Sequence, residues 1–184
     1  MTARLGGEFR VALLRGINLG SSNRLPMPAL VAMFEAAGCV DVRHYIQSGN
    51  IVFRANEKLG ARLGSLIAKR IAADYGYDVP VILRSAAELR EVLRVNPFLD
   101  RGTEGKTLHV AFLAAEPDPA RVSALDAKRS PPDSFAVVGR EIYLYCPNGV
   151  GQTKLTNAYF DAKLGTTSTM RNWNTVQKLV AMME

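Results

Sequence analysis

The chain has 184 residues, of which 48% are apolar and 22% charged, and its formal net charge is +6. This balance is typical of a folded globular protein, and no apolar run approaches the ~18 residues that a membrane-spanning helix needs. Because Met1 to Gly7 contain no long apolar stretch that would serve as a signal peptide, we expect a cytoplasmic protein without membrane attachment.

The first half of the chain predicts the element order β-α-β-β-α-β, which is the ferredoxin-like arrangement. We expect a strand over 9–15, a helix over 28–37, strands over 42–47 and 51–54, a helix over 57–74 and a strand over 79–83. Pro28 suits a first helical turn, Gly38 suits a C-terminal cap, and Ser48-Gly49-Asn50 is a turn sequence. The second helix carries an apolar stripe of Leu59, Leu63, Leu66, Ile67 and Ile71.

The second half repeats most of this order. We expect a helix over 86–95, a connection at Asn96-Pro97 and Arg101 to Thr103, a strand over 107–114, a helix over 119–127, strands over 134–138 and 141–146, and helices over 153–164 and 169–183. The sequence therefore predicts an α+β protein with two tandem ferredoxin-like subdomains over 1–100 and 101–184. The second subdomain is expected to have a C-terminal helix in place of the last strand.

The opening strand is apolar on both of its faces. Val11 and Leu13 lie on one face, and Ala12 and Leu14 lie on the other. A sheet with one solvated face alternates polar and apolar residues instead. We therefore expect the second face to be covered, either by the other half of the chain or by a second copy in a homo-oligomer.

A polar loop follows the first strand and contains the first candidate binding residues. Arg15, Asn18 and Asn23 lie in this loop, which is also rich in glycine and serine. Glycine lets main-chain N–H groups approach a ligand, and arginine offers a forked donor to phosphate or carboxylate. The spacing does not match the GxGxxG pattern of dinucleotide loops. The alternative is a polar connection that binds no ligand.

Two further polar segments follow in chain order. Gln47, Ser48 and Asn50 form the tip of the first hairpin, where a well-formed turn is the favoured alternative to ligand binding. Lys154 ends the segment that begins at Pro147, which does not match GxxxxGK[ST] and is therefore no P-loop. A helix start capped by Thr153 is the more ordinary explanation of that segment.

The last polar segment surrounds the only tryptophan. Trp173, Val176, Val180 and Met183 follow helical spacing, which favours a core position for the indole. Arg171, Asn172 and Asn174 lie beside it and offer either a polar site or a solvated helix start.

The residue types of common catalytic and metal sites are sparse. Cys39 and Cys146 show no CxxC pattern, and His44 and His109 each lie inside a predicted strand. No HExxH or GxSxG motif is present. We expect buried, reduced cysteines and structural histidines, with no metal and no cofactor.

Four segments in this order carry a resemblance to a known family: Val11 to Asn18, Tyr45 to Phe53, Asn148 to Leu155 and Thr169 to Val176. They resemble the family called domain of unknown function 1697 over nearly the whole chain. The resemblance implies two ferredoxin-like subdomains. The family has no established activity, so no catalytic residue follows from it. The family pattern often shows Gly-Gly after Ile-Asn-Val, where this chain has Leu19-Gly20-Ser21.

These observations favour a cytoplasmic protein that binds a small anionic or polar ligand. The candidate ligand-binding residues are Arg15, Asn18, Asn23, Gln47, Ser48, Asn50, Lys154, Arg171, Asn172 and Asn174. Scattered Lys and Arg leave nucleic-acid binding as an alternative, which predicts a steep loss of affinity with salt. An enzyme of unrecognised type and an interaction protein acting as an oligomer are the other two hypotheses.

Overall fold

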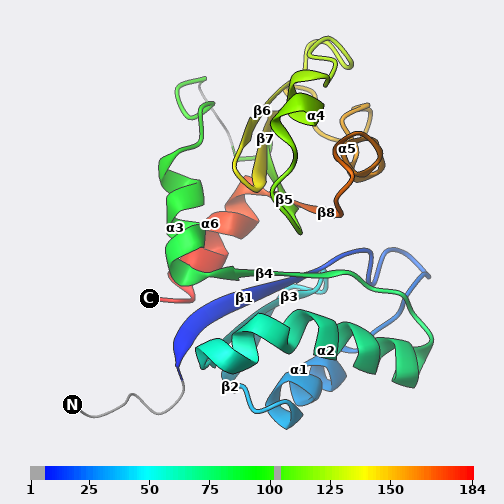
Figure 1. The fold of residues 1–184 in the computed structure, drawn as a ribbon, viewed down its shortest axis with the longest axis vertical. Coiled ribbons are helices and arrows are strands. Elements are labelled where there is room, and N and C mark those ends of the chain that lie inside the picture. The colour runs from blue at the N-terminus through cyan, green and yellow to red at the C-terminus, as the bar shows by residue number, and fades with distance from the viewer. Residues whose placement is uncertain (1–6, 102–104) are drawn as a thin grey trace. The chain divides into compact units, whose positions relative to one another are not determined.

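The computed structural model describes residues 7–101 and 105–184 (Figure 1). The chain divides into two compact units, unit 1 with Met1–Leu89 and Leu179–Glu184, and unit 2 with Arg90–Lys178. The connection expected at Arg101 to Thr103 lies, apart from Arg101, outside the described residues. None of the described helices is both long and apolar enough to cross a membrane.

Unit 1 contains a four-stranded antiparallel sheet in the order β2-β3-β1-β4. Its elements are β1 (Glu8–Leu14), α1 (Met27–Ala36), β2 (Val40–Tyr45), β3 (Asn50–Ala55), α2 (Glu57–Tyr75) and β4 (Val81–Ser85). Helices α1 and α2 lie on one face of this sheet (Figure 1), and the apolar core fills the space between them and the strands. The first six elements therefore follow the predicted order.

Unit 2 contains a second four-stranded antiparallel sheet, in the corresponding order β6-β7-β5-β8. Its elements are β5 (Leu108–Leu113), α4 (Pro119–Ser123), β6 (Ser134–Val138), β7 (Glu141–Tyr145), α5 (Asn157–Leu164) and β8 (Ser168–Asn172). Two more helices, α3 (Ala86–Arg94) and α6 (Trp173–Ala181), begin directly after β4 and β8. The α+β class is confirmed.

The expectation of a C-terminal helix in place of the fourth strand of unit 2 was wrong. Ser168–Asn172 form β8, which pairs with β5, and helix α6 starts only at Trp173. A five-residue strand that runs without a loop into a helix gives no separate turn signal, so its residues join the helical pattern that follows. The helical spacing from Trp173 onward was correct, and the indole is buried at 5% exposure.

Helix α5 also begins later than expected. Thr156, not Thr153, is its N-cap, and its side chain accepts a hydrogen bond from the Tyr159 N–H at 3.2 Å. Thr153 instead accepts from the Leu155 N–H at 3.2 Å. Both threonines satisfy the local rule for a cap, so the sequence pattern alone does not separate them.

Helix α2 shows why its residues form a long helix. The Asn56 side chain accepts a hydrogen bond from the Leu59 N–H at 2.9 Å, and Gly76 ends the helix in the left-handed region at φ 71°. Leu59, Leu63, Ile67 and Ile71 are buried against the sheet. Leu66, expected in this stripe, is 42% exposed and is not part of the buried core.

Both faces of β1 are buried, as the sequence predicted. Ala12 and Leu14 belong to the core beneath α1 and α2, and Val11 and Leu13 on the opposite face have no exposed surface. The equivalent strand β5 is buried along its whole length.

The tip of the β2–β3 hairpin contacts the end of β1. Gly49 accepts a hydrogen bond from the Leu14 N–H at 2.9 Å and has φ 76°. A Cβ at position 49 would lie 2.8 Å from Leu14 Cβ and 2.9 Å from Ile17 Cδ1. Only glycine satisfies both the backbone angle and this close approach. The contact brings two of the predicted polar segments together.

Gly49→Ala is therefore expected to destabilise the protein by about 2–4 kcal/mol, from left-handed strain and overpacking together. Gly20→Ala is the matched control, because Gly20 has φ 57° but open space around its Cβ position. The control is expected to cost about 1 kcal/mol. Urea denaturation measures both changes, and equal effects would contradict the close approach.

The two cysteines are free and buried. Burial raises the pKa of the Cys39 and Cys146 thiols to about 11. Since the thiolate is the reactive form, we expect neither cysteine of the native protein to react with Ellman's reagent within minutes at pH 8. Both should react in denaturant, and a fast-reacting thiol in the native protein would contradict this assignment.

Candidate functional site

The loop between β1 and α1 is organised by the side chain of Asn18. Its Nδ2 donates to the Leu25 carbonyl at 3.0 Å and to the Gln47 carbonyl at 2.9 Å. Its Oδ1 accepts from the Leu25 N–H at 2.8 Å. The carboxamide thus bonds to Leu25 as a neighbouring strand would, and it also ties the loop to the hairpin tip. Asn18 is a framework residue of this region.

Asn23 closes the same loop from within. Its Nδ2 donates to the Gly16 carbonyl at 3.0 Å, and its own carbonyl accepts from the Asn18 N–H at 3.0 Å. Asn18 and Asn23 have φ values of 53° and 47°, in the left-handed region that asparagine tolerates better than most residues. The asparagines predicted as ligand contacts therefore hold the loop in shape.

The polar side chains of the hairpin tip have two different roles. Asn50 is fully buried, and its Nδ2 donates to Ser48 Oγ at 2.9 Å and to the Tyr45 carbonyl at 3.2 Å. Gln47 is exposed, and its side-chain amide makes no hydrogen bond to the described residues. Asn50 and Ser48 shape the turn, and Gln47 presents an uncommitted amide to solvent.

A polar pocket of about 350 Å³ lies where the loop and the hairpin tip meet. Six residues line it: Asn18, Gly20, Arg24, Leu25, Pro26 and Gln47. The Arg24 side chain is exposed and has no hydrogen-bond or ion-pair partner within residues 7–101 and 105–184. The pocket therefore offers a guanidinium and a neutral amide beside the hydrogen-bonded Asn18.

Helix α1 begins at this pocket. Pro26 is its N-cap and supplies no side-chain cap, and the first turn contains no acidic residue. Pro28 has no main-chain N–H, so the first turn offers the N–H groups of Met27 and Ala29, whose partial positive charge adds to that of the Arg24 guanidinium. Leu25 and Pro26 connect these groups to the pocket wall. The local field thus favours an anion over a cation.

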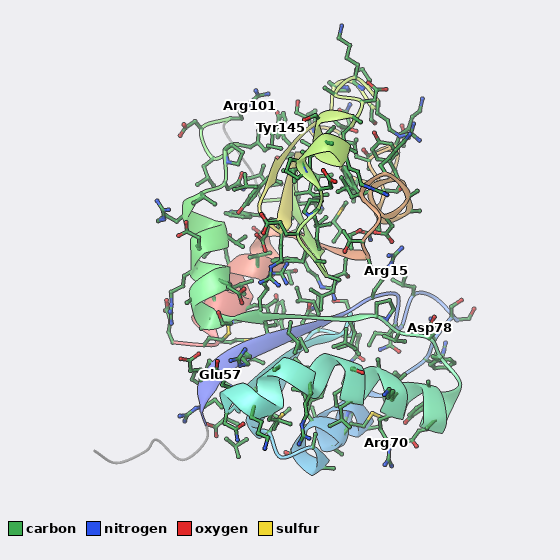
Figure 2. All side chains as sticks on the ribbon, viewed as in Figure 1. Arg15, Glu57, Arg70, Asp78, Arg101 and Tyr145 are labelled. Atoms are coloured by element: carbon green, nitrogen blue, oxygen red, sulfur yellow. The ribbon has the colours of Figure 1, made fainter. Side chains whose placement is uncertain are left out.

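Arg15 lies just outside this pocket. It is half-buried on the loop that leaves β1, where Figure 2 shows its side chain, and its N–H donates to the Pro80 carbonyl at 3.0 Å. It is not among the lining residues. Arg24, which directly follows the candidate Asn23 in the sequence, is the charged lining residue that was not among the predicted site residues. It belonged to the same polar loop, but nothing in the loop's composition distinguished it from Arg15.

The polar residues of unit 2 have structural partners of their own. Arg171 lies on β8, is 9% exposed, and donates to Thr169 Oγ1 at 2.8 Å and to the Met170 carbonyl at 2.9 Å. Burial lowers the pKa of this guanidinium to about 10, so it remains charged at neutral pH. Asn172 donates to the Gly105 carbonyl at 3.0 Å and accepts from the Asn174 N–H at 2.9 Å.

Lys154 lies in the loop before α5 rather than at a helix start. Its N–H donates to Ser130 Oγ at 3.1 Å, and its carbonyl accepts from Arg129 Nε at 3.2 Å. Arg129 also stacks on the Tyr159 ring, 4.2 Å from its centroid. The main chain of Lys154 therefore joins two loops. Its side chain is exposed and does not line the polar pocket.

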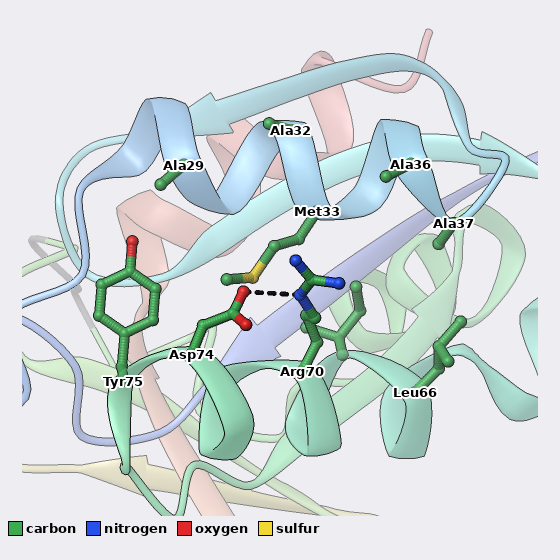
Figure 3. A pocket seen from close by; sticks show the side chains of 10 residues that line it. Ala29, Ala32, Met33, Ala36, Ala37, Leu66, Arg70, Asp74 and Tyr75 are labelled. Carbon is green, nitrogen blue, oxygen red and sulfur yellow. Dashed lines mark hydrogen bonds and ion pairs between the residues drawn. The ribbon is translucent and has the colours of Figure 1, made fainter.

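A second, apolar groove of about 450 Å³ lies between α1 and α2 (Figure 3). Its lining includes Ala29, Ala32, Met33, Ala36, Ala37, Leu66, Ile67 and Tyr75. Arg70 Nε donates to Asp74 Oδ2 at 2.6 Å along one side. Its only charged groups are already paired with each other, so this groove suits a polar ligand less well. No cluster of His, Cys, Asp or Glu that would hold a metal occurs among the described side chains.

The fold and the site define the class of this protein: an α+β protein with two four-stranded antiparallel sheets of corresponding strand order and a polar loop pocket in its first unit. The chain belongs to the family described as protein of unknown function DUF1697, which matches residues 8–143. The resemblance seen in the sequence is thereby confirmed.

The chain is also similar to a solved structure, that of the conserved bacterial protein SP0830 from Streptococcus pneumoniae. The two share 22% sequence identity with a TM-score of 0.71, over 96% of this chain and 99% of that chain. At this identity the likeness concerns the fold alone. No match is found among curated proteins.

Asn18→Ala is expected to destabilise the protein by about 2–3 kcal/mol, because three side-chain hydrogen bonds to main-chain groups are lost and a left-handed residue gains strain. Asn23→Ala is the matched control, since Asn23 has a similar φ but one such bond. Its cost should be about 1–2 kcal/mol lower than that of Asn18→Ala. Urea denaturation compares the two, and a control that costs as much would contradict the framework role of Asn18.

Proposed function

We propose that the pocket between the β1–α1 loop and the β2–β3 hairpin tip binds a small anionic ligand, and that this binding is the function of the protein. The observation that carries the proposal is the placement of the Arg24 guanidinium, which has no partner among the described residues, and the Gln47 amide on the wall of one pocket. A guanidinium fork matches the oxygen pairs of a phosphate or carboxylate, and a neutral amide adds directional hydrogen bonds.

The size and rigidity of the pocket support a small molecule. Its volume of about 350 Å³ lies at the lower end of the range for small-molecule sites. The Asn18 carboxamide holds both walls in place before any ligand arrives. A preformed site loses less conformational entropy on binding than a mobile loop would. The net charge of +6 favours the approach of anions.

The chemistry of the pocket supports binding more than turnover. Arginine and amide groups position and stabilise negative charge, but none of the six lining residues is a titratable acid, base or nucleophile near neutral pH. The ligand class is a phosphate- or carboxylate-bearing small molecule. It stays a prediction that other polar residues of the chain also bind an anion: Arg15, Lys154, Arg171, Asn172 and Asn174.

The proposal includes two broader statements about the protein. Each unit follows the strand order of a ferredoxin-like sheet, so we describe the chain as two tandem ferredoxin-like subdomains. We also place the protein in the cytoplasm, where two buried, free cysteines are the usual state.

Arg24→Ala and Gln47→Ala are expected to abolish a ligand-induced thermal shift while leaving the unliganded protein as stable as the wild type. The screen uses phosphate, sulfate, citrate, nucleoside monophosphates and short oligonucleotides, each at low and high salt. A ligand at 100 times its Kd stabilises the wild type by about 2.7 kcal/mol. Arg62→Ala is the matched control, since it removes the same charge from an exposed position on α2.

Two outcomes of this screen would contradict the proposal. One is a shift that survives both pocket substitutions. The other is a shift produced only by oligonucleotides and lost at high salt, which would indicate a basic surface that binds nucleic acid.

A further inference from the structure

The corresponding edge strands of the two sheets differ in the features that prevent pairing with another chain. Strand β2 is an edge strand of unit 1, and β6 is the corresponding edge strand of unit 2. In β2, Asp41 has φ 51°, the register with β3 shifts between Val40 and Arg43, and charged side chains lie along the strand. Bulges and charges of this kind prevent an edge strand from pairing with another chain.

Strand β6 has none of these protections. Its five residues, Ser-Phe-Ala-Val-Val, include no charge and no proline, and it pairs with β7 in regular register. Figure 1 shows β6 at the margin of the unit 2 sheet, and no described residue pairs with its outer side. Val138, at its end, is 44% exposed. An uncharged, regular and unpaired edge is suited to pairing with another strand.

The turn of the hairpin decides which groups of β6 face outward. A two-residue turn, Gly139-Arg140, joins Val138 to Glu141, and Gly139 has φ 57°. Such a turn closes on a hydrogen-bonded pair, and hydrogen bonding alternates along an antiparallel ladder. Phe135 and Val137 therefore direct their main-chain N–H and C=O groups away from β7.

We propose that β6 pairs with β6 of a second copy of this chain, in an antiparallel arrangement about a two-fold axis. Phe135 then lies opposite Val137 of the second copy, and Ala136 faces Ala136 of the second copy at the axis. Because the strand is uncharged, this self-pairing brings no like charges together. An isologous contact of this kind closes as a dimer rather than a filament.

The side chains on both faces of β6 are compatible with this pairing. Phe135 and Val137 pack against the apolar core of unit 2, and the Phe135 ring lies edge-on to Phe160 with centroids 5.6 Å apart. Pairing would extend that core across the two copies. On the other face, Val138 would lie opposite Ser134 of the second copy, so its exposed surface would be partly covered.

Ala136→Lys and Ala136→Glu test the proposal as a pair. Each variant places like charges opposite each other at the axis and is expected to be monomeric, and an equimolar mixture should restore the dimer. Sedimentation velocity over a range of concentrations measures the association state. Val40→Lys is the matched control on the protected strand β2 and should associate as the wild type does.

Hydrogen exchange gives a readout that does not depend on folding of the variants. In the wild type, the amides of Phe135 and Val137 should gain protection as concentration rises, and that of Val138 should be protected throughout. A wild type that stays monomeric at all concentrations would overturn the proposal. So would an Ala136→Lys variant that dimerises normally, or a dimer in which Phe135 and Val137 exchange freely.

Discussion

The carboxamide of Asn18 is the constraint on which the candidate site depends. It bonds to the two main-chain groups of Leu25 and to the carbonyl of Gln47, so one side chain joins a long loop to a hairpin tip. Gly49 completes the junction, because its missing side chain allows the tip to lie against Leu14 and Ile17. Among the described residues that line the pocket, these contacts leave the polar side chains of Arg24 and Gln47 for a ligand.

The two units are alike where the fourth strand of each sheet meets the following helix, but they differ in the loop after the first strand. Arg84 on β4 lies opposite Val11, and Arg171 on β8 lies opposite Val110, and both guanidiniums are buried. Each strand runs directly into a helix whose start is bonded by the preceding Ser85 or Asn172. The units differ in the loop after the first strand, which spans 15–26 in unit 1 and only 114–118 in unit 2. A pocket built from that loop is thus a property of unit 1.

The element order was predictable where hydrophobic period and turn residues agreed. This holds for α2, with its buried stripe and its Asn56 and Gly76 caps, and for the first hairpin. Strand β8 was missed because no turn separates it from α6. Its identity depends on pairing with β5, a long-range interaction that leaves no local pattern in five residues.

The sequence predicted which segments form the candidate site, but it did not predict which of their side chains bond to the main chain and which face the pocket. Composition placed Asn18, Asn23 and Asn50 in polar loops, but an amide that binds a ligand and an amide that binds the main chain have the same sequence signature. In the three-dimensional structure, all three amides form hydrogen bonds within the protein itself. Arg24 was passed over because its lack of a partner is a property of three-dimensional surroundings.

The most direct test of the central claim is an NMR titration of ¹⁵N-labelled protein with inorganic phosphate, followed by the anion that gives the largest thermal shift. We expect chemical-shift changes at the Gly20 amide, the Gln47 side-chain amide and the Arg24 Nε–H, and we expect the Asn18 side chain to be ordered, with its resonances visible, before ligand is added. Changes centred on Arg171 and Asn174 with none at Arg24 would contradict it, as would an Asn18 side chain that is mobile in the free protein.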